Sequence, residues 1–360
     1  MRFPEFTGEW EEETLGSVAK VVGGGTPDTN IQKYWNGNIQ WFTPSEIGRD
    51  KYVTYSLRTI SEEGLNKSSA KILPTGTILL SSRATVGECS INNVECTTNQ
   101  GFQSLIAKEN ISNEFLFYLI QTKRKKLIRK SCGSTFLEIS ANEVRKIKIA
   151  IPTHKEQKKI GKLLALLDER IATQTKIIDK LQTLIKGIGK HLFTNSANWK
   201  TAKIGELLRI GNGKDYKHLG IGKIPVYGTG GQMLLVNDYL YDGDSVCIGR
   251  KGTIDKPMFL TNKFWVVDTL FYTYDFKDVL PKFCYYLFQQ INWKLFNEGT
   301  GVPSLSKSTI DNIKVKIPTL EQQKTISTFL SSLERKVEIE EMLLNGMKNQ
   351  KQYLLRQMFI

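Results

Sequence analysis

The chain has 360 residues, of which 40% are hydrophobic and 24% charged, and its formal net charge is +14. This composition is typical of a folded globular protein and excludes a disordered or collagen-like chain. No stretch approaches the roughly 18 consecutive apolar residues of a membrane span, and the N-terminus lacks a signal-peptide pattern, so we expect a cytoplasmic protein without membrane contact. The positive charge favours a polyanion such as nucleic acid, or an acidic protein, as partner.

Residue types that carry catalysis or bind metals are sparse. The five cysteines are never spaced as C-x-x-C, and the three histidines form no metal-ligand pattern. The sequence contains no G-x-x-x-x-G-K-[ST] phosphate loop and no Asn-Pro-Pro-aromatic tetrapeptide. We therefore predict a chain without a catalytic centre, a metal or a cofactor of its own.

Residues 1–150 predict a first globular domain. Short β-rich runs such as "GTILLSS" alternate with turn-forming stretches such as "GGGTPDTN", and the helical pattern "NEFLFYLIQTKRKKLIRK" follows. We expect an α+β fold with a mixed or mostly antiparallel sheet. Hydroxyl, amide and basic side chains in loops suit contact with phosphates and base edges, and the candidates are Thr43, Ser45, Ser81, Ser82, Arg83, Thr85, Asn99 and Gln100. Lys123 and Arg124 join them from the basic helix, whose charge run is equally typical of a solvated face.

Residues 151–196 predict a long helix that begins after Pro152. Apolar residues recur in alternating steps of four and three, which is the heptad pattern of a coiled coil. The seam residues are Ile160, Leu164, Leu167, Ile171, Ile178 and Leu181, with Gln174 as a polar interruption. About 40 helical residues span on the order of 60 Å.

Residues 197–316 predict a second α+β domain with similar runs. Its candidates for contact with nucleic acid are Lys214, Tyr227, Thr229, Gly230, Arg250, Lys251, Thr253 and Thr300. Arg250 follows a predicted strand in "GRKGT", just as Arg83 does in "SSRATVG". The Gly-rich loops "YGTGG" and "GTGVPS" would let the backbone approach a phosphate, although plain turn geometry is the more common explanation of such loops.

Residues 317–360 repeat the first long helix. Residues 147–193 align with residues 313–359 without a gap, and 11 of these 47 positions are identical. The second seam contains Ile326, Leu330, Leu333, Val337 and Leu344. We expect the two helices to pair as an antiparallel coiled coil, and the alternative is that each packs on its own domain.

The repeated segments, residues 147–193 and 313–359, are called the two copies of the frame. The regions between them differ in sequence. "IPTHKEQKKI" at residues 151–160 returns as "IPTLEQQKTI" at residues 317–326, at the entrance to each long helix. A duplicated enzyme would more often keep its reactive residues in both copies, whereas here the shared residues belong to the frame. We therefore predict that Gln157, Gln323, Lys158 and Lys324 serve helix-entry packing or partner docking.

The chain resembles the specificity subunits of type I restriction-modification systems over nearly its whole length. The resemblance rests on "FPEFTGEWEEETLGSV", on the two repeats that begin "IPTHKEQKK" and "IPTLEQQKT", and on "NWKTAKIGELLRIGNGK". It implies two target recognition domains that each read one half of a bipartite, asymmetric sequence in double-stranded DNA. It also implies a coiled coil that sets their spacing.

The resemblance also implies partner subunits. Two modification subunits would dock on the coiled coil and bring S-adenosylmethionine, and restriction subunits would add ATP- and Mg-dependent translocation and cleavage. Two other functions stay open at this point. One is a coiled-coil adaptor for acidic proteins without DNA specificity, and the other is an intrinsic methyltransferase or nuclease.

Overall fold

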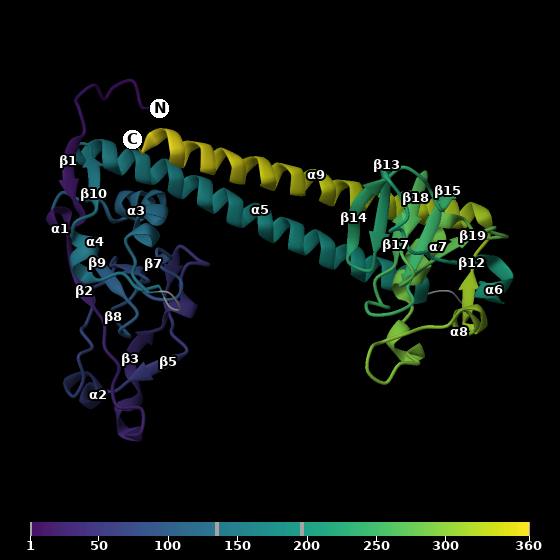
Figure 1. The fold of residues 1–360 in the computed structure, drawn as a ribbon, viewed down its shortest axis with the longest axis horizontal. Coiled ribbons are helices and arrows are strands. Elements are labelled where there is room, and N and C mark those ends of the chain that lie inside the picture. Colours follow the sequence, from purple (N-terminus) through teal and green to yellow (C-terminus); the bar gives the residue numbers. More distant parts are fainter. Residues whose placement is uncertain (1, 134–136, 195–197, 360) are drawn as a thin grey trace. The chain divides into compact units, whose positions relative to one another are not determined.

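The computed structural model describes residues 2–133, 137–194 and 198–359. The chain divides into two compact units, one made of residues 1–174 and 343–360 and the other of Thr175–Met342. Each unit holds one β-rich domain and half of each of two long helices, α5 (His154–Thr194) and α9 (Leu320–Met358) (Figure 1).

The predicted α+β class and the two long helices are confirmed. The four-part division at residues 150, 196 and 316 stays a prediction. Its boundary at residues 196 and 197, like its two ends at residues 1 and 360, lies outside the described residues.

The first β-rich domain contains a five-stranded sheet in the order β2-β9-β6-β7-β4 and a three-stranded sheet in the order β5-β3-β8. Both are mixed, because β4 pairs with β7 and β3 with β8 in parallel. The bounds are β1 (Glu11–Thr14), α1 (Leu15–Val18), β2 (Ala19–Gly23), η1 (Gln32–Tyr34), β3 (Trp35–Phe42), η2 (Pro44–Glu46), β4 (Tyr52–Val53), β5 (Arg58–Ile60), α2 (Glu62–Asn66), β6 (Ile78–Leu80), β7 (Cys89–Asn92), β8 (Cys96–Thr98), β9 (Gln103–Ala107), α3 (Asn113–Arg129), α4 (Ala141–Arg145) and β10 (Lys148–Ile151).

The second β-rich domain contains two four-stranded sheets, in the orders β12-β19-β16-β17 and β14-β13-β18-β15. Only the pairing of β13 with β18 is parallel among the strand pairs described for this domain. The bounds are β11 (Lys200–Lys203), α6 (Ile204–Leu207), β12 (Arg209–Asn212), β13 (Ile221–Gly228), β14 (Gly231–Val236), β15 (Tyr241–Asp242), β16 (Ser245–Gly249), β17 (Met258–Leu260), β18 (Lys263–Val266), β19 (Leu270–Tyr274), α7 (Pro281–Gln290), η3 (Trp293–Phe296), α8 (Lys307–Asn312) and β20 (Lys314–Ile317).

Each domain is closed by pairing its first strand with its last. β1 pairs antiparallel with β10, and β11 pairs antiparallel with β20. The residue that follows the first strand continues the pairing in both domains. The backbone N–H of Leu15, after β1, donates to Ile147 O at 3.0 Å, and that of Ile204, after β11, donates to Ile313 O at 3.0 Å. The two copies of the frame are therefore built alike down to single hydrogen bonds.

A buried glutamine joins each long helix to the main helix of its domain. Gln157 is 2% exposed; its Nε2 donates to Pro152 O at 2.9 Å, and its Oε1 accepts from the N–H of Ser112, the residue that caps α3, at 3.0 Å. Gln323 is fully buried and donates to Pro318 O at 3.0 Å, while its Oε1 accepts from the N–H of Leu280, the cap of α7, at 2.8 Å.

This pattern explains why the "IPT…Q" phrase occurs twice. One amide side chain satisfies both a carbonyl and an N–H that the turn and the helix end leave without backbone partners. Lys158 and Lys324, the neighbours of the two glutamines, are exposed.

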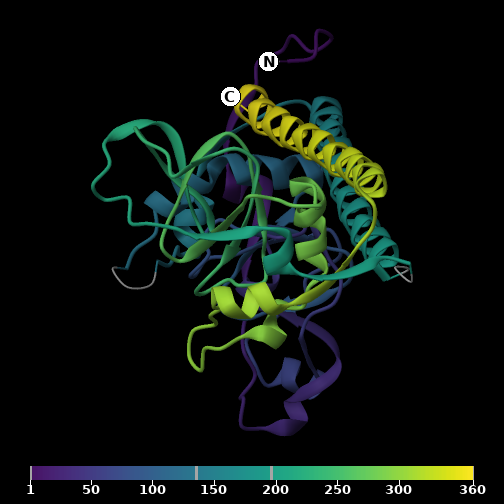
Figure 2. The same ribbon diagram turned by 90° about the vertical axis from the view of Figure 1, so that its right-hand side faces the viewer.

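α5 and α9 run antiparallel within each unit, as predicted, and both views show them side by side (Figures 1 and 2). In the first unit Asp168 of α5 pairs with Lys351 of α9 at 2.6 Å, and in the second Gln182 Nε2 donates to Glu341 Oε1 at 3.2 Å. A later residue of α5 thus contacts an earlier residue of α9, as expected for antiparallel helices. The predicted seam residues are all buried or partly buried: Ile160, Leu164, Leu167, Ile171, Ile178, Leu181, Ile326, Leu330, Leu333, Val337 and Leu344.

The far end of each long helix packs on aromatic residues of the unit in which it ends. Phe359, just after α9, lies 5.2 Å from the ring of Phe115 and 6.4 Å from that of Trp10. Phe193, near the end of α5, lies 5.3 Å from Phe283 and 5.7 Å from Trp199 in the same way.

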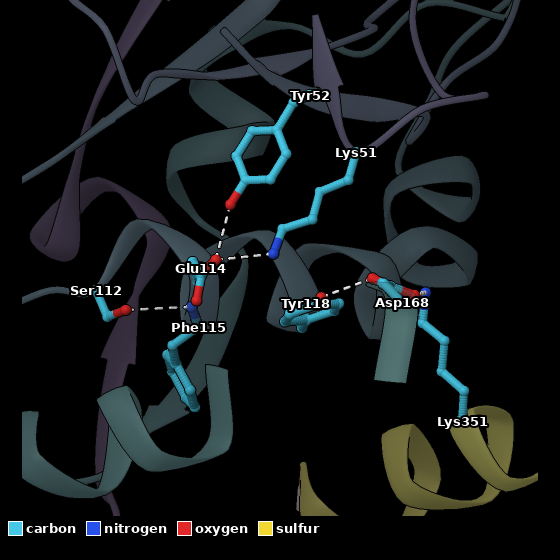
Figure 3. A network of polar contacts seen from close by, with 8 residues as sticks. All are labelled: Lys51, Tyr52, Ser112, Glu114, Phe115, Tyr118, Asp168 and Lys351. Carbon is cyan, nitrogen blue, oxygen red and sulfur yellow. Dashed lines mark hydrogen bonds and ion pairs between the residues drawn. The ribbon is translucent and has the colours of Figure 1, made fainter. Parts of the chain in front are cut away.

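A tyrosine and an acid link the domain helix to the long helix in both units. Tyr118 of α3 donates to Asp168 Oδ2 at 2.6 Å, and Asp168 Oδ1 holds the ammonium of Lys351 (Figure 3). Tyr286 of α7 donates to Glu334 Oε2 at 2.6 Å, and Glu334 stands 166 residues after Asp168. Burial, and then the hydrogen bond to the carboxylate, raise the pKa of both phenols.

No helix in the described part of the chain is long and apolar enough to cross a membrane.

We expect Gln157→Leu and Gln323→Leu each to destabilise their unit by about 1–3 kcal/mol, because each leaves a partly buried N–H and a buried carbonyl without the glutamine as partner. Thermal unfolding followed by circular dichroism measures the loss. Lys158→Ala, one residue away and exposed, is the control and should change the midpoint little. Equal midpoints for Gln157→Leu and Lys158→Ala would contradict this role.

We expect stability to fall as pH rises above about 10, the pKa of an unfolded tyrosine. The folded chain keeps the protons of Tyr118 and Tyr286, whose pKa values are raised, whereas the unfolded chain releases them. The contribution of these phenols is therefore fully present below that pH and lost above it. The variant with Tyr118→Phe and Tyr286→Phe should show a shallower decline in its unfolding midpoint at alkaline pH. The exposed Tyr55→Phe variant should follow the wild type.

Candidate nucleic-acid interface

In the second β-rich domain, loops that are far apart in sequence meet around Arg250. The backbone of Lys251 bridges to Ser304, the N–H of Gly252 donates to Pro303 O at 2.8 Å, and the N–H of Leu305 donates to Arg250 O at 2.9 Å. The loop after β16 therefore lies directly against the loop that carries Thr300.

β18 and the segment between β18 and β19 bind the backbone of three candidates, Arg250, Tyr227 and Lys214. The N–H of Arg250 donates to Thr269 O at 2.8 Å, and the carbonyl of Tyr227 accepts from Val267 at 3.0 Å. The carbonyl of Lys214 accepts from the indole of Trp265 at 2.8 Å. The sequence-predicted residues of this domain thus share one set of neighbouring loops.

Thr229 and Thr253 lie close to the glycines of these loops. A Cβ added at Gly252, whose φ is +87°, would lie 3.9 Å from Thr229 Oγ1. Thr253 O lies so close to Gly249 that a Cβ there would come within 2.1 Å, so the loop around Arg250 is tightly folded. Gly230 and Thr300 are exposed.

Arg250 and Lys251 present their charges to solvent. Both side chains are exposed, and neither forms an ion pair within residues 2–133, 137–194 and 198–359. The guanidinium of Arg250 lies 5.9 Å from the ring of Phe271. Unpaired cations beside exposed glycine backbone are the groups that bind phosphates and guanine edges.

The first β-rich domain forms the equivalent arrangement around Arg83. The backbone of Arg83 bridges to Glu138, and the N–H of Ser82 donates to Gly101 O at 2.8 Å. Glu138 stands 166 residues before Ser304, which bridges to Lys251 in the other domain. The repeat therefore places the two loop sets on matching parts of the frame.

The amide and hydroxyl candidates of this domain lie beside that loop. The N–H of Asn99 donates to Phe42 O at 3.0 Å, and Asn99 Oδ1 accepts from the N–H of Gly101 at 2.8 Å. Thr43 and Ser45 share a hydroxyl hydrogen bond of 3.0 Å. Gln100 accepts a hydrogen bond from the hydroxyl of Thr26, a residue of the turn-forming stretch "GGGTPDTN".

Ser81 and Ser82 do not present their hydroxyls to a ligand, contrary to expectation. Both are fully buried. Ser81 Oγ donates to Arg83 O at 2.9 Å and accepts from Thr85 Oγ1 at 3.0 Å, so it holds the turn that exposes Arg83 and Thr85. β6 ends at Leu80, but the backbone continues in isolated bridges from Ser81 to Phe102 and from Arg83 to Glu138, where both serines are buried, and these two residues are removed from the candidate interface.

The basic candidates of the first domain are already paired or partly buried. Arg83 pairs with Glu138 at 2.8 Å, with both side chains 45% exposed, and Arg124 pairs with Glu88 at 2.6 Å. Burial, and then the charge of Lys126, lower the pKa of Lys123. A DNA phosphate would have to compete with these carboxylates, whereas Arg250 has no such competitor in the described residues.

Among the described residues, no three His, Cys, Asp or Glu side chains lie close enough together to hold a metal ion.

The comparison with protein families matches both halves of the chain. The family described as the type I restriction modification DNA specificity domain matches residues 7–183 and again residues 196–349. Each match covers one β-rich domain and most of the long helix that follows it.

Several curated specificity subunits are similar to this chain. The MjaIX subunit of Methanocaldococcus jannaschii is 31% identical over 58% of this chain, and the EcoR124I/EcoR124II subunit of Escherichia coli is 32% identical over 45%. These alignments span 53% and 41% of the two relatives, about half of their length. The MjaVIII subunit of M. jannaschii is 23% identical over 94% of this chain and 89% of its own length.

Solved structures share the fold over nearly the whole chain. The type I restriction-modification S subunit from M. genitalium superposes with a TM-score of 0.65 at 16% identity, covering 99% of this chain and 97% of that one. A chain from a structure of complex assembly and conformational transition of the type I R-M system gives a TM-score of 0.66 at 15% identity, with 98% of each chain covered. With a family match over both halves, this chain belongs to the type I restriction modification DNA specificity family.

Proposed function

We propose that this chain is the DNA-recognition subunit of a type I restriction-modification complex. The observation that carries the proposal is the pair of loop sets around Arg83 and Arg250, held on matching frames and built from different residues. Because the two loop sets have equivalent places on the frame, both domains can bind the same DNA duplex. Because their side chains differ, the two half-sites should differ in sequence. The whole DNA target is then bipartite and asymmetric.

We further propose that α5 and α9 set the spacing of the half-sites and dock the modification subunits. The seam between the helices is covered, yet their outer faces keep large apolar side chains in solvent: Leu166, Ile177, Leu184, Phe329, Ile339, Met342, Leu343 and Tyr353, each 41–66% exposed. Exposed apolar residues along paired helices are typical of a protein interface. Two similar frames support two copies of the same partner.

Catalysis then belongs to the other subunits. The modification subunits would supply S-adenosylmethionine chemistry on adenine, and the restriction subunits would join through the complex with ATP and Mg. This chain contributes the contacts that choose the sequence.

Sequencing methylated adenines in a host that carries the whole system tests the proposal. We expect one two-part motif with a fixed spacer. Deleting Thr175–Leu181 and residues 341–347 removes one heptad from each helix and keeps both seams in phase. The shortened chain should methylate the same two half-sites across a shorter spacer. An unchanged spacer would refute the spacing role.

Binding measurements with the assembled complex provide the control. Affinity for the motif should exceed that for a scrambled duplex and should fall steeply with salt, because phosphate contacts release counterions. Binding without sequence preference and without salt dependence would favour the adaptor for acidic proteins instead.

We expect Arg250→Ala to weaken recognition of one half-site by about 1–3 kcal/mol, the range for a bidentate base contact. Arg83→Ala should weaken recognition of the other half-site by a smaller amount, because Arg83 already forms an ion pair with Glu138. Arg209→Ala, which removes an exposed arginine from β12, is the matched control. The methylated motif of each variant shows which half is relaxed, and relaxation of the same half by both variants would contradict this assignment.

A further inference from the structure

Two large side chains in the first β-rich domain stand almost entirely in solvent. Tyr55 is 84% exposed and Leu57 is 87% exposed, on the connection between β4 and β5. β3 and β5 lie at the end of this domain remote from the start of α5 (Figure 1). Nothing in the frame repeat or in the polar loop set explains why these side chains are exposed.

The backbone beneath these side chains is held firmly. The N–H of Ser56, between them, donates to Gln40 Oε1 at 2.7 Å, and Ser56 Oγ accepts from the N–H of Trp41 at 2.9 Å and donates to Arg58 O at 2.6 Å. The N–H of Leu57 donates to Glu46 Oε1 at 2.6 Å. The turn is thus anchored on β3, and its two apolar side chains project from a fixed base.

The same anchors connect the turn to the candidate interface. Glu46, which holds Leu57, accepts through its other oxygen from the N–H and the hydroxyl of Thr43, at 2.7 and 2.6 Å. The guanidinium of Arg58 lies 3.6 Å from the centre of the buried Trp35 ring. The carboxylate of Glu46 therefore holds both this turn and Thr43 of the candidate interface, and Arg58 directly follows Leu57 in the chain.

Double-stranded DNA is the occupant that these surroundings favour. A stable protein interface buries about 800 Å² on each partner, far more than two side chains separated by an anchored serine provide. One or two apolar side chains, in contrast, are what architectural proteins insert between base pairs, and an exposed aromatic ring is suited to stacking on a base.

We propose that Tyr55 and Leu57 form an apolar wedge that enters the DNA at the half-site read by the first domain and unstacks one base step. The inference rests on the proposed function and deepens it. The wedge adds specificity for base steps that open at low cost, without a hydrogen bond to any base. The polar loop set around Arg83 then reads the neighbouring base pairs.

Base-stacking probes test the wedge in the assembled complex. Duplexes carry 2-aminopurine or pyrrolocytosine at each position of the mapped half-site in turn. We expect the wild-type complex to raise fluorescence at one step, and the variant with Tyr55→Ala and Leu57→Ala to abolish the rise. Its affinity should fall about 10- to 100-fold, the range for losing a stacked aromatic contact.

Controls separate the wedge from a general loss of structure or function. Ile72→Ala removes another exposed apolar side chain of the same domain and should leave the rise unchanged. Tyr55→Phe with Leu57→Met should restore it. Because both wedge residues are exposed, their variants should unfold at the wild-type temperature.

The remaining outcomes overturn the inference in distinguishable ways. Specific binding by the wild type without a rise at any position, or an undiminished rise in the double alanine variant, sinks the wedge and leaves the proposed function standing. A double variant that no longer joins the modification subunits marks this surface as a protein contact. A wild-type complex without sequence preference overturns both the wedge and the proposed function.

Discussion

The amide of one buried glutamine in each frame is the contact on which the rest of the architecture depends. Gln157 and Gln323 each bind the carbonyl of the proline that precedes a long helix and the N–H at the cap of a domain helix. Each long helix enters its domain through a single turn, and this glutamine ties the start of the helix to the domain helix before the tyrosine–acid link does so further along. The glutamine fixes it with groups that would otherwise be buried without partners, and the loop sets are positioned through the same helices.

The sequence was sufficient for the frame because the frame is periodic and repeated. Heptad spacing identified the long helices, and their antiparallel packing in both units confirms the pairing inferred from two seams. The role of Gln157 was predicted only as helix-entry packing or docking, because the cap that it binds lies 45 residues earlier in the chain. The link between Tyr118 and Asp168 was missed for the same reason, since neither residue is unusual within its own helix.

The loops were harder to predict because side-chain exposure depends on where strands end. Ser81 and Ser82 have the composition of a phosphate-binding loop, yet they are buried at the end of the sheet. Arg83 and Lys251 stand at matching points of the two loops, because each bridges to the corresponding residue of the repeat. Among the described residues only Arg83 of this pair has a carboxylate beside it, supplied by a segment 55 residues later. The contact residues themselves stay predictions, and the exposed Tyr55 and Leu57 lack any pattern that would have distinguished them from a core strand.

The aromatic residues at the helix ends give each β-rich domain the same two attachments. Trp10 and Phe115 receive Phe359, and Trp199 and Phe283 receive Phe193, while the first strand of each domain always pairs with its last. Each β-rich domain is therefore joined to the long helices by the same kinds of contact. Exchange of the segment between these repeated ends would replace the β-rich domain and its candidate contact residues, while the strand pairing and the helix attachments stay as they are.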